Sequence, residues 1–349
     1  MKKIHIYASN EYDVIISRGI LDKCGELIEE IIPKCRVAII SDDVVFPMYG
    51  NIVKKSLENS GYDVVSYIFE NGEKSKNIRT YTNILEFLAE NHLTRTDIVI
   101  ALGGGVCGDM AGFAAATYLR GIKFVQIPTT LLAAVDSSVG GKTGINLEAG
   151  KNLAGAFCQP SIVICDSDTL KTLPADTFSD GVSEAIKCGM IRDKELFEKM
   201  GGDFSENIED VIASCVTIKS QVVASDEFDK GERQLLNFGH TVGHAIEKCS
   251  NFSITHGHAV AIGMVIITKA AEKLGLCQYG TYDALEDTLK KCGLPVTCRF
   301  SAEELYNVTL SDKKRAGDSV TLVVPEKTGK CVLHKVKTDE LLEYIKKGL

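Results

Sequence analysis

Short strand-like runs alternate with helical stretches through the first half of the chain, and this alternation limits the fold more than any other feature. The runs are rich in apolar and β-branched residues and occupy 3–7, 13–17, 36–41, 63–69, 97–102, 123–128 and 161–165. Amphipathic helical patterns separate several of them, for example at 21–32 and 78–91. Parallel strands need crossover connections, which are usually helices, so this rhythm predicts a mostly parallel sheet covered by helices. The first half is therefore expected to form a Rossmann-like α/β domain of the nucleotide-binding type.

The pattern changes after Thr172-Leu173-Pro174. Helical periodicity then dominates, over 183–190, 193–200, 208–224, 239–249, 258–274 and 282–291. One late hairpin is expected, with strands 320–324 and 331–336 joined by a turn at Thr328-Gly329. Because 349 residues exceed the usual size of one domain, we expect an α/β domain at 1–175 and a mostly α-helical domain at 176–349.

Charge and composition exclude several classes of partner. The formal net charge of -8 argues against attraction to nucleic acid or to an anionic membrane. No stretch approaches about 18 uncharged apolar residues and the first residues lack the apolar run of a signal peptide, so a cytoplasmic location is expected. The twelve cysteines include no C-x-x-C pair, which disfavours a zinc knuckle, a dithiol redox motif and a disulfide framework.

Three histidines lie within seventeen residues, at His240, His244 and His256, among glycines. On a helix, residues four apart share a face, so His240 and His244 are expected to address one pocket, which His256 can join from the start of the next helix. A lone histidine is more often a capping or core group, but a cluster favours a divalent-metal site. The acidic ligand should come from a neighbouring helix. Glu184, with Lys187 one turn later, is the candidate on the helix predicted at 183–190. On spacing alone, that pair could equally be a surface ion pair.

A glycine-rich turn follows the predicted strand 97–102. Gly103-Gly104-Gly105-Val106-Cys107-Gly108-Asp109 formally matches G-x-G-x-x-G, in which glycines let backbone N–H groups approach a pyrophosphate. In the usual dinucleotide fold, this fingerprint follows the first strand and an acidic residue comes about 20 residues later, and neither holds here. The turn is therefore either structural or part of a different nucleotide-binding arrangement.

A second polar stretch covers 128–146 and continues in Gly150-Lys151-Asn152. Its hydroxyls, glycines and two lysines suit a phosphate or a polyol. Gly140-Gly141-Lys142-Thr143 ends like a nucleotide triphosphatase loop, but Val135 stands where the first glycine should be, so that activity fits poorly. The cations Lys219, Arg233 and Lys313-Lys314 come from separate segments, and each taken alone is expected to be a solvated surface charge.

Taken together, these segments resemble the 3-dehydroquinate synthases, within the sugar phosphate cyclase family, in order from residue 42 to about residue 314. The resemblance rests on the stretches 72–76, 103–109, 128–142, 150–152, 172–174, 184–187, 233–244 and 312–314. Their common order and spacing make the match specific, although no one of them would settle the family.

The resemblance implies roles for individual residues. Zn²⁺, or Co²⁺, would be held by Glu184, His240 and His256, with His244 facing the substrate instead, although spacing alone would have placed His244 in the metal shell. NAD would contact Asp42, Glu73, Lys76, Gly104, Gly105, Val106, Asp109, Thr129, Thr130, Lys151, Thr172 and Leu173. Catalytic groups facing the substrate would be Lys142, Lys187, Lys219, Arg233, Asn237 and His244, and further substrate contacts would come from Asp136, Asn152 and one of Lys313 and Lys314. Arg120 is similar to an arginine that enters the partner subunit's site in a homodimer.

The implied activity is the conversion of 3-deoxy-D-arabino-heptulosonate 7-phosphate to 3-dehydroquinate and phosphate, a step of the shikimate pathway to chorismate and the aromatic amino acids. It proceeds by transient oxidation with NAD, phosphate elimination, re-reduction, ring opening and aldol closure, so the enzyme is a carbon–oxygen lyase without net redox. The alternatives are a cyclase acting on glucose 6-phosphate or sedoheptulose 7-phosphate, a metal-dependent polyol dehydrogenase, and a non-catalytic nucleotide sensor. Lys219, Arg233 and Asn237 resemble the carboxylate-binding pattern of dehydroquinate synthases, which favours the first activity.

Four positions depart from the family pattern. His258 stands where Glu is usual, Asp229 replaces a second Glu, and Asp176 and Thr177 replace an Arg-Glu pair. None of them removes a proposed metal ligand. We expect His258 to alter metal affinity or its pH dependence and Thr177 to weaken one contact near the nucleotide.

Overall fold

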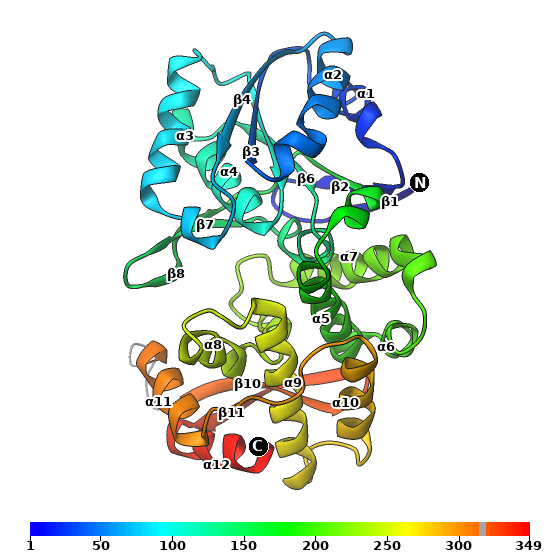
Figure 1. Ribbon diagram of the computed structural model, residues 1–349, viewed down its shortest axis with the longest axis vertical. Helices are drawn as coiled ribbons and strands as arrows, with labels where there is room; N and C mark the ends of the chain where they lie inside the picture. Colours follow the sequence, from blue (N-terminus) through cyan, green and yellow to red (C-terminus); the bar gives the residue numbers. More distant parts are fainter. Residues whose placement is uncertain (314–318) are drawn as a thin grey trace. The chain divides into compact units, whose positions relative to one another are not determined.

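The computed structural model describes residues 1–313 and 319–349, and the side chains of all of these except 311–313. It divides the chain into two compact units (Figure 1). Unit 1 comprises Met1–Leu173 and Lys219–Phe228, and unit 2 comprises Pro174–Ile218 and Asp229–Leu349. The sequence predicted a single cut at residue 175. The observed division lies two residues earlier, and the return of Lys219–Phe228 to unit 1 is a feature that one cut does not anticipate.

Unit 1 is built on a seven-stranded sheet with the order β1-β2-β9-β6-β5-β3-β4. All neighbouring strands are parallel except β1 and β2. The strands are β1 (Lys2–Ile6), β2 (Tyr12–Ser17), β3 (Arg36–Asp42), β4 (Asp63–Phe69), β5 (Ile98–Gly103), β6 (Lys123–Pro128) and β9 (Ile162–Asp166). Each predicted strand is confirmed to within one residue at either end, and the mostly parallel sheet is confirmed with them.

Helices cover both faces of this sheet. Val37 and Ile39 of β3 belong to the core cluster that contains residues of α1 (Cys24–Glu29) and α2 (Asn51–Asn59). Ala38 and Ile40 belong to the opposite cluster, with residues of α3 (Ile78–Glu90) and α4 (Gly105–Thr117). Successive side chains of a strand point to opposite faces, so a strand buried on both sides is apolar along its length, as β3 is from Val37 to Ile40.

The topology fixes where a ligand can bind in unit 1. The chain leaves β3 towards β4 at one edge of the sheet but leaves β5 towards β6 in the opposite direction. The carboxyl ends of β3 and β5 are therefore the switch point of the sheet, where ligands of open α/β sheets bind. Asp42 ends β3 and Gly103 ends β5, so the two predicted cofactor segments meet there.

A hairpin of β7 (Lys142–Leu147) and β8 (Gly150–Phe157) was not predicted, because the polar stretch in this part of the sequence indicated a binding loop. The two backbones approach closely at glycines. A Cβ atom at Gly155 would lie 2.1 Å from Thr143 O, and one at Gly144 would lie 2.6 Å from Ala154 O. These strands therefore lack the alternation of β-branched residues by which strands are recognised.

Unit 2 is mostly helical, as predicted (Figure 1). Helix α9 packs against α5, α8, α10 and α12 and is buried along almost its whole length. The helices are α5 (Ala175–Arg192), α6 (Lys194–Met200), α7 (Ile208–Ser225), α8 (His240–Cys249), α9 (His256–Lys273), α10 (Thr281–Lys291), α11 (Ala302–Lys313) and α12 (Thr338–Gly348). From Lys219 onward, α7 belongs to unit 1.

The predicted late hairpin is confirmed as β10 (Ser319–Lys327) and β11 (Lys330–Lys337). Each helix predicted in this half overlaps an observed one, whereas α11 and α12 were missed, as was α2 in unit 1. Among the residues that the structure describes, no helix combines the length and apolar character that crossing a membrane requires.

Candidate functional site

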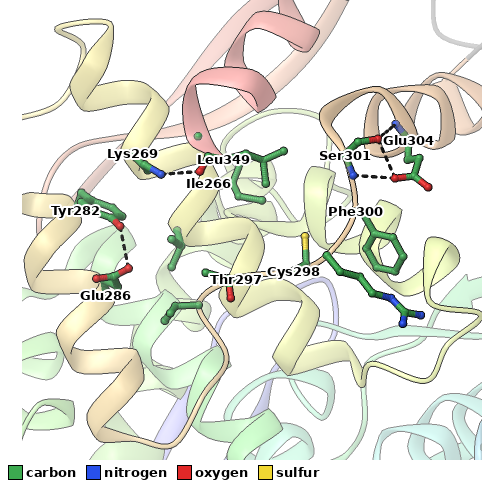
Figure 2. Close-up of a pocket in the computed structure, with 14 residues that line it drawn as sticks. Ile266, Lys269, Tyr282, Glu286, Thr297, Cys298, Phe300, Ser301, Glu304 and Leu349 are labelled. Atoms are coloured by element: carbon green, nitrogen blue, oxygen red, sulfur yellow. Dashed lines mark hydrogen bonds between the residues drawn. The ribbon is translucent and has the colours of Figure 1, made fainter.

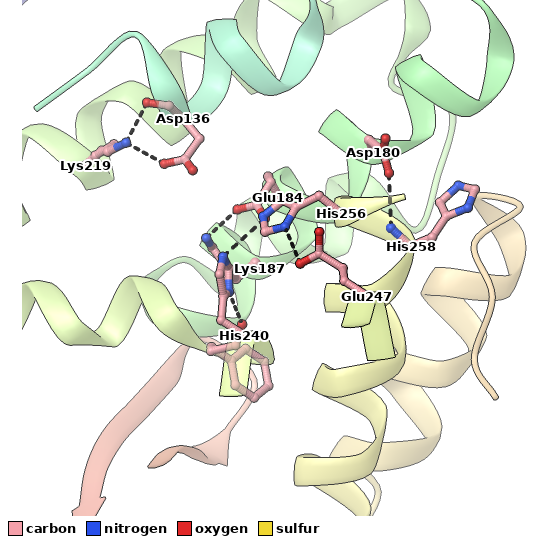
Figure 3. A network of polar contacts seen from close by, with 10 residues as sticks. Asp136, Asp180, Glu184, Lys187, Lys219, His240, Glu247, His256 and His258 are labelled. Carbon is pink, nitrogen blue, oxygen red and sulfur yellow. Dashed lines mark hydrogen bonds and ion pairs between the residues drawn. The ribbon is translucent and has the colours of Figure 1, made fainter. Parts of the chain in front are cut away.

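Three side chains of unit 2 converge on one point (Figure 3). Glu184 of α5 places Oε1 3.8 Å from Nε2 of His240 at the start of α8 and 3.7 Å from Nε2 of His256 at the start of α9. These distances are too long for hydrogen bonds, and Glu184 Oε1 is buried without a hydrogen-bond donor. Two ligands that each lie about 2 Å from a tetrahedral zinc ion are roughly 3.3–3.5 Å apart. The cluster therefore fits a divalent cation between the three groups.

Glycines allow this convergence by letting the helices approach closely. A Cβ atom at Gly263 of α9 would lie 2.1 Å from the carbonyl oxygen of Gly239 and 2.9 Å from the nitrogen of Gly243. Gly239 has φ of 78°, which favours glycine, and it directly precedes His240. A Cβ atom at Gly257 would lie 2.4 Å from Cα of Asp180, which draws α9 against α5. The first turns of α8 and α9 thereby meet the middle of α5.

The other ring nitrogen of each proposed ligand is also engaged. Nδ1 of His240 lies 3.1 Å from the carbonyl oxygen of Phe238, and Nδ1 of His256 lies 3.3 Å from Oε2 of Glu247. Such contacts fix ring orientation and leave Nε2 for a metal. Burial, with the nearby Lys187 charge, lowers the pKa of His240 well below its ordinary value, which keeps the ring neutral. Burial lowers the pKa of His256, but the hydrogen bond with Glu247 and the charges of Glu184 and Glu247 together outweigh burial, so the net shift is upward.

His244 lies beside the other two imidazoles but is exposed. Its ring centroid is 5.4 Å from that of His240 and 5.9 Å from that of His256. His244, Glu247 and His256 form a second group whose ligand atoms could hold a cation. Helical spacing predicted that His240 and His244 lie close together, and the structure places them so. Only the group with Glu184 contains a buried carboxylate oxygen that lacks a donor, so that group is the better metal candidate.

Lys219 and Arg233, which were predicted to be surface charges when taken singly, are buried, and so is Lys187. Lys187 and Glu184 form an ion pair whose side chains are 2% and 1% exposed, so the surface alternative for this pair is wrong. Arg233, in the short turn Glu232–Asn237 of unit 2, is 2% exposed. In unit 1, Lys219 is 6% exposed and donates to the carbonyl oxygen and the carboxylate of Asp136 (Figure 3). Buried charges need partners, and for Lys219 a segment 83 positions away in the sequence supplies one.

The switch point of unit 1 has features of a nucleotide site. Helix α4 begins at Gly105 with Gly104 as its N-cap, so its first N–H groups face the sheet end, where an anion is favoured. A Cβ atom at Gly104 would lie 3.0 Å from Cγ2 of Thr130, so a side chain at this position would crowd the approach to the sheet end. Thr129 Oγ1 is buried without a hydrogen-bond partner. Asp42 accepts bonds from the backbone N–H groups of residues 44 and 45. These observations favour the nucleotide interpretation of the glycine turn.

Lys76 connects the predicted cofactor and substrate residues of unit 1. Its Nζ donates to Asp109 Oδ2 at 2.5 Å and to Asn152 Oδ1 at 2.6 Å. Burial raises the pKa of Asp109, and Lys76 opposes that shift. Thr172 Oγ1 lies 2.6 Å from the hydroxyl of Tyr49, next to the predicted contact Leu173. The remaining predicted contacts on this side, Val106, Lys142 and Lys151, belong to α4, β7 and β8.

Some predicted residues are not joined to these clusters. Arg120 and Asn237 are exposed, and Arg120 has φ of 69°. Lys313 and Lys314 lie outside the residues whose side chains are described. Among the departures, His258 contacts Ser179 Oγ at 2.8 Å through Nε2.

Sequence reasoning gave no individual role to Glu247, or to Asn146, whose Nδ2 donates to Oε1 of the predicted cofactor residue Glu73 at 2.7 Å. Glu247 could have been found, because it lies seven residues after His240 and therefore on the same helical face. Asn146 carried no comparable signal.

A separate cavity of about 360 Å³ opens in unit 2 (Figure 2). It is lined by α9, α10, the end of the chain and the segment 296–301. Lys269 Nζ donates to Leu349 O at 2.7 Å, and the Tyr282 hydroxyl donates to Glu286 at 2.8 Å. None of the described residues that were predicted to bind metal, cofactor or substrate lines this cavity, so it is treated separately from the candidate site.

Comparison with known proteins identifies the family. The family model for the 3-dehydroquinate synthase N-terminal domain matches residues 66–180, and the model for the C-terminal domain matches residues 181–315. The 3-dehydroquinate synthase of Clostridium acetobutylicum is 45% identical over 344 residues, which cover 97% of both chains. The chain belongs to the 3-dehydroquinate synthase family. The family's relative from Enterococcus faecalis is 43% identical over 352 residues, covering 99% of this chain and 98% of the relative.

Solved structures share the fold. A 2-deoxy-scyllo-inosose synthase complexed with carbaglucose-6-phosphate, NAD⁺ and Co²⁺ has a TM-score of 0.89 and 27% identity, with both chains fully covered. A 2-epi-5-epi-valiolone synthase from Streptomyces hygroscopicus has a TM-score of 0.88 at 24% identity, with 99% of both chains covered. Glycerol dehydrogenase from Schizosaccharomyces pombe has a TM-score of 0.71 at 15% identity, covering 99% of this chain and 91% of that one. The last two likenesses concern the fold alone and support the Rossmann-like assignment of unit 1.

Proposed function

We propose that this chain is an enzyme that converts 3-deoxy-D-arabino-heptulosonate 7-phosphate to 3-dehydroquinate and phosphate. The observation that carries the proposal is the convergence of Glu184, His240 and His256 in a chain that belongs to this family. The 45% identity to a protein named 3-dehydroquinate synthase supports this substrate over those of other sugar phosphate cyclases. The activity makes the chain a phosphate-eliminating lyase of the shikimate pathway.

Glu184, His240 and His256 would hold Zn²⁺ or Co²⁺, whose ligand preferences include imidazole and carboxylate. The inosose synthase with 27% identity was crystallised with Co²⁺, which supports a divalent ion of this kind here. When bound, the ion would supply Lewis acidity towards substrate hydroxyls. Lys187 forms an ion pair with the buried Glu184 and orients its carboxylate, while the exposed His244 would present an imidazole to the substrate.

NAD would bind at the switch point of unit 1, where it supplies a reversible acceptor of hydride. Asp42 and the turn through Gly104 and Gly105 would orient it, and Thr129 offers a hydroxyl that no protein group uses. The chain's own contribution here is to fix the position of the hydride acceptor and to exclude water from it.

The substrate carries a carboxylate and a phosphate, so its binding needs several local cations in an acidic chain. Lys142 and Lys219 of unit 1 and Arg233 of unit 2 are candidates, together with Lys313 or Lys314. The Lys219 ammonium is held by Asp136, which fixes its position before a substrate arrives. Charge-assisted hydrogen bonds from such groups are the strong kind, and they would hold the substrate for elimination and ring closure.

The test supplies the keto acid phosphate with NAD⁺ and Zn²⁺ and follows inorganic phosphate together with absorbance at the NADH band. Phosphate release without lasting NADH is expected, and Glu184→Gln, which removes the carboxylate from the proposed metal group, should abolish this release. Release from glucose 6-phosphate or sedoheptulose 7-phosphate instead would indicate another cyclase. Steady NADH formation from a polyol would indicate a dehydrogenase, and an absence of phosphate release would refute the proposal.

The enzyme is further proposed to act in the cytoplasm as a homodimer in which Arg120 enters the site of the other copy. Leu119 and Arg120 both have positive φ, at 50° and 69°, which is uncommon outside glycine and often marks functional segments. Light scattering of the purified chain checks the dimer. Mixing Arg120→Ala chains with Glu184→Gln chains should restore partial activity, because one mixed site keeps both groups. A monomer, or no restoration, would refute the dimer proposal.

A further inference from the structure

Asn146, near the end of β7, contacts residues from both predicted binding groups of unit 1. Its Nδ2 donates to Glu73 Oε1 at 2.7 Å, and its Oδ1 accepts from the backbone nitrogen of Asn152 at 2.9 Å. Its own backbone nitrogen donates to the carbonyl oxygen of Lys76 at 2.9 Å. Glu73 and Lys76 are predicted to bind NAD and Asn152 to bind the substrate. One amide side chain thus joins the two groups.

The orientation of the Asn146 amide follows from its partners. Glu73 offers a carboxylate, which accepts when ionised, and the backbone of Asn152 offers an N–H, which only donates. Reversing the amide would set an oxygen against the carboxylate and an NH₂ group against the N–H. Both contacts therefore depend on asparagine at this position.

The contact with Asn152 supports an unfavourable backbone conformation. Asn152 has φ of 55°, in the left-handed region that non-glycine residues seldom adopt. Held in this way, its side-chain oxygen reaches Lys76 Nζ at 2.6 Å, and the same ammonium reaches Asp109 at 2.5 Å. A continuous chain of hydrogen bonds then runs from Glu73 through Asn146, Asn152 and Lys76 to Asp109.

The β7–β8 hairpin needs such an anchor. The two strands form a sheet of their own, and their register shifts between Ile145 and Leu147, so Asn146 sits at an irregularity. A two-stranded hairpin is marginally stable alone, and bulges commonly redirect a side chain at a functional site. Asn146 also forms an isolated bridge with Asn77, which directly follows Lys76. The end of the hairpin is thereby tied to the segment that carries Glu73 and Lys76.

We infer that Asn146 is a positioning residue that couples the binding of NAD to the binding of the substrate. The inference rests on the proposed function. A ligand that orders Glu73 and Lys76 also orders Asn152 through Asn146, so the second ligand binds to a site that is already arranged. By linkage, the effect is reciprocal: each ligand tightens the other by the same factor.

The test measures the dissociation constant of NAD⁺ by calorimetry with and without a saturating substrate analogue. The analogue is the phosphonate in which a methylene group replaces the bridging oxygen, so that phosphate cannot leave. In the parent enzyme, the analogue should tighten NAD⁺ binding by about fivefold or more, the lower range of typical coupling. In Asn146→Ala, the analogue should change the dissociation constant of NAD⁺ by less than about twofold. In turnover, the KM values for both ligands should rise while kcat at saturation stays nearly constant, because Asn146 touches no reacting atom.

Asn146→Asp separates the two contacts. It keeps the acceptor for Asn152 but sets a second negative charge against Glu73, so NAD⁺ binding should weaken more than analogue binding does. The matched control is Asn91→Ala in the same unit, where the amide donates to Phe87 O and touches no predicted site residue. That variant should lose comparable stability while it retains the coupling factor of the parent.

The outcomes separate this inference from the proposed function. A coupling factor that persists in Asn146→Ala, or one that equals unity in the parent enzyme, overturns the inference even if phosphate is released. Coupling that is lost in Asn146→Ala but not in Asn91→Ala supports it, even if the parent enzyme releases no phosphate and the proposed function fails. Failure of the analogue to bind the parent enzyme rejects both.

Discussion

Gly263→Ala should weaken metal binding far more than it weakens the fold. The new Cβ would lie 2.1 Å from Gly239 O, about 0.9 Å closer than the 3.0 Å below which real Cβ contacts essentially never fall. The backbone at the start of α8 has to move by about that amount, and it carries His240. Overpacking of this kind costs about 1–3 kcal/mol, and the better helix propensity of alanine returns about 1 kcal/mol. The net loss of stability is therefore about 0–2 kcal/mol.

Metal ligation tolerates less displacement than packing does. Ligand distances in zinc sites hold to about 0.2 Å, so a shift several times larger should lower zinc affinity by about tenfold or more. Competition with a chromophoric chelator measures the affinity, and calorimetry of the metal-free protein measures the stability. The control is Gly202→Ala, where the new Cβ meets nothing nearer than 3.6 Å. If Gly263→Ala binds zinc as tightly as Gly202→Ala does, the close approach of α8 and α9 does not set the metal site, and the argument fails.

Three further outcomes are expected. Glu247→Gln keeps the shape of the side chain but removes the charge that faces His256 Nδ1, so zinc affinity should fall by about 10–100-fold in chelator competition with little change in the unfolding temperature. Gly104→Val should weaken NAD⁺ binding in calorimetry and leave zinc affinity unchanged, since its side chain would press on Thr130; equal loss of both would contradict separate sites. Hydrogen bonds with Asp13, and to a smaller extent with Glu11, raise the pKa of His5. Charged His5 therefore contributes its full stabilisation of the fold below the ordinary pKa of about 6.5, and this stabilisation is lost as pH rises through the raised pKa. Urea unfolding of parent and His5→Gln proteins at several pH values should therefore converge at high pH, and a gap that widens with pH would refute this.

The central strands of unit 1, such as β5 and β9, were predictable because they are buried on both faces and consist mostly of consecutive apolar residues, many of them β-branched. The β7–β8 hairpin was not predicted, because Gly144 and Gly155 occupy the positions where the two backbones approach most closely. A side chain at either position would collide with the facing strand, so the pairing requires glycine. Glycine has a low strand propensity, and a prediction from propensity therefore does not find these strands. The same residues supplied the polar character that indicated a binding loop.

The metal cluster was predictable in part. Helical spacing brought His240 and His244 together, and the cluster of three imidazoles indicated a metal, but spacing could not decide which of them face a carboxylate. That choice depends on Gly257 and Gly263, which set how closely α9 meets α5 and α8. The glycines are visible in the sequence, whereas the atoms they approach are known only once the helices are packed.

Burial of the cations was the least predictable feature, for a physical reason. An isolated lysine or arginine is expected at the surface, because moving its charge out of water costs several kcal/mol. Lys219 can be 6% exposed because its ammonium donates hydrogen bonds to the carboxylate and carbonyl oxygen of Asp136, a residue more than eighty positions earlier. The resemblance named Lys219 and Asp136 as substrate residues without implying that they touch. Their contact indicates that Asp136 holds the ammonium until a substrate anion competes for it, so Asp136→Asn should change the KM for the substrate more than it changes zinc affinity.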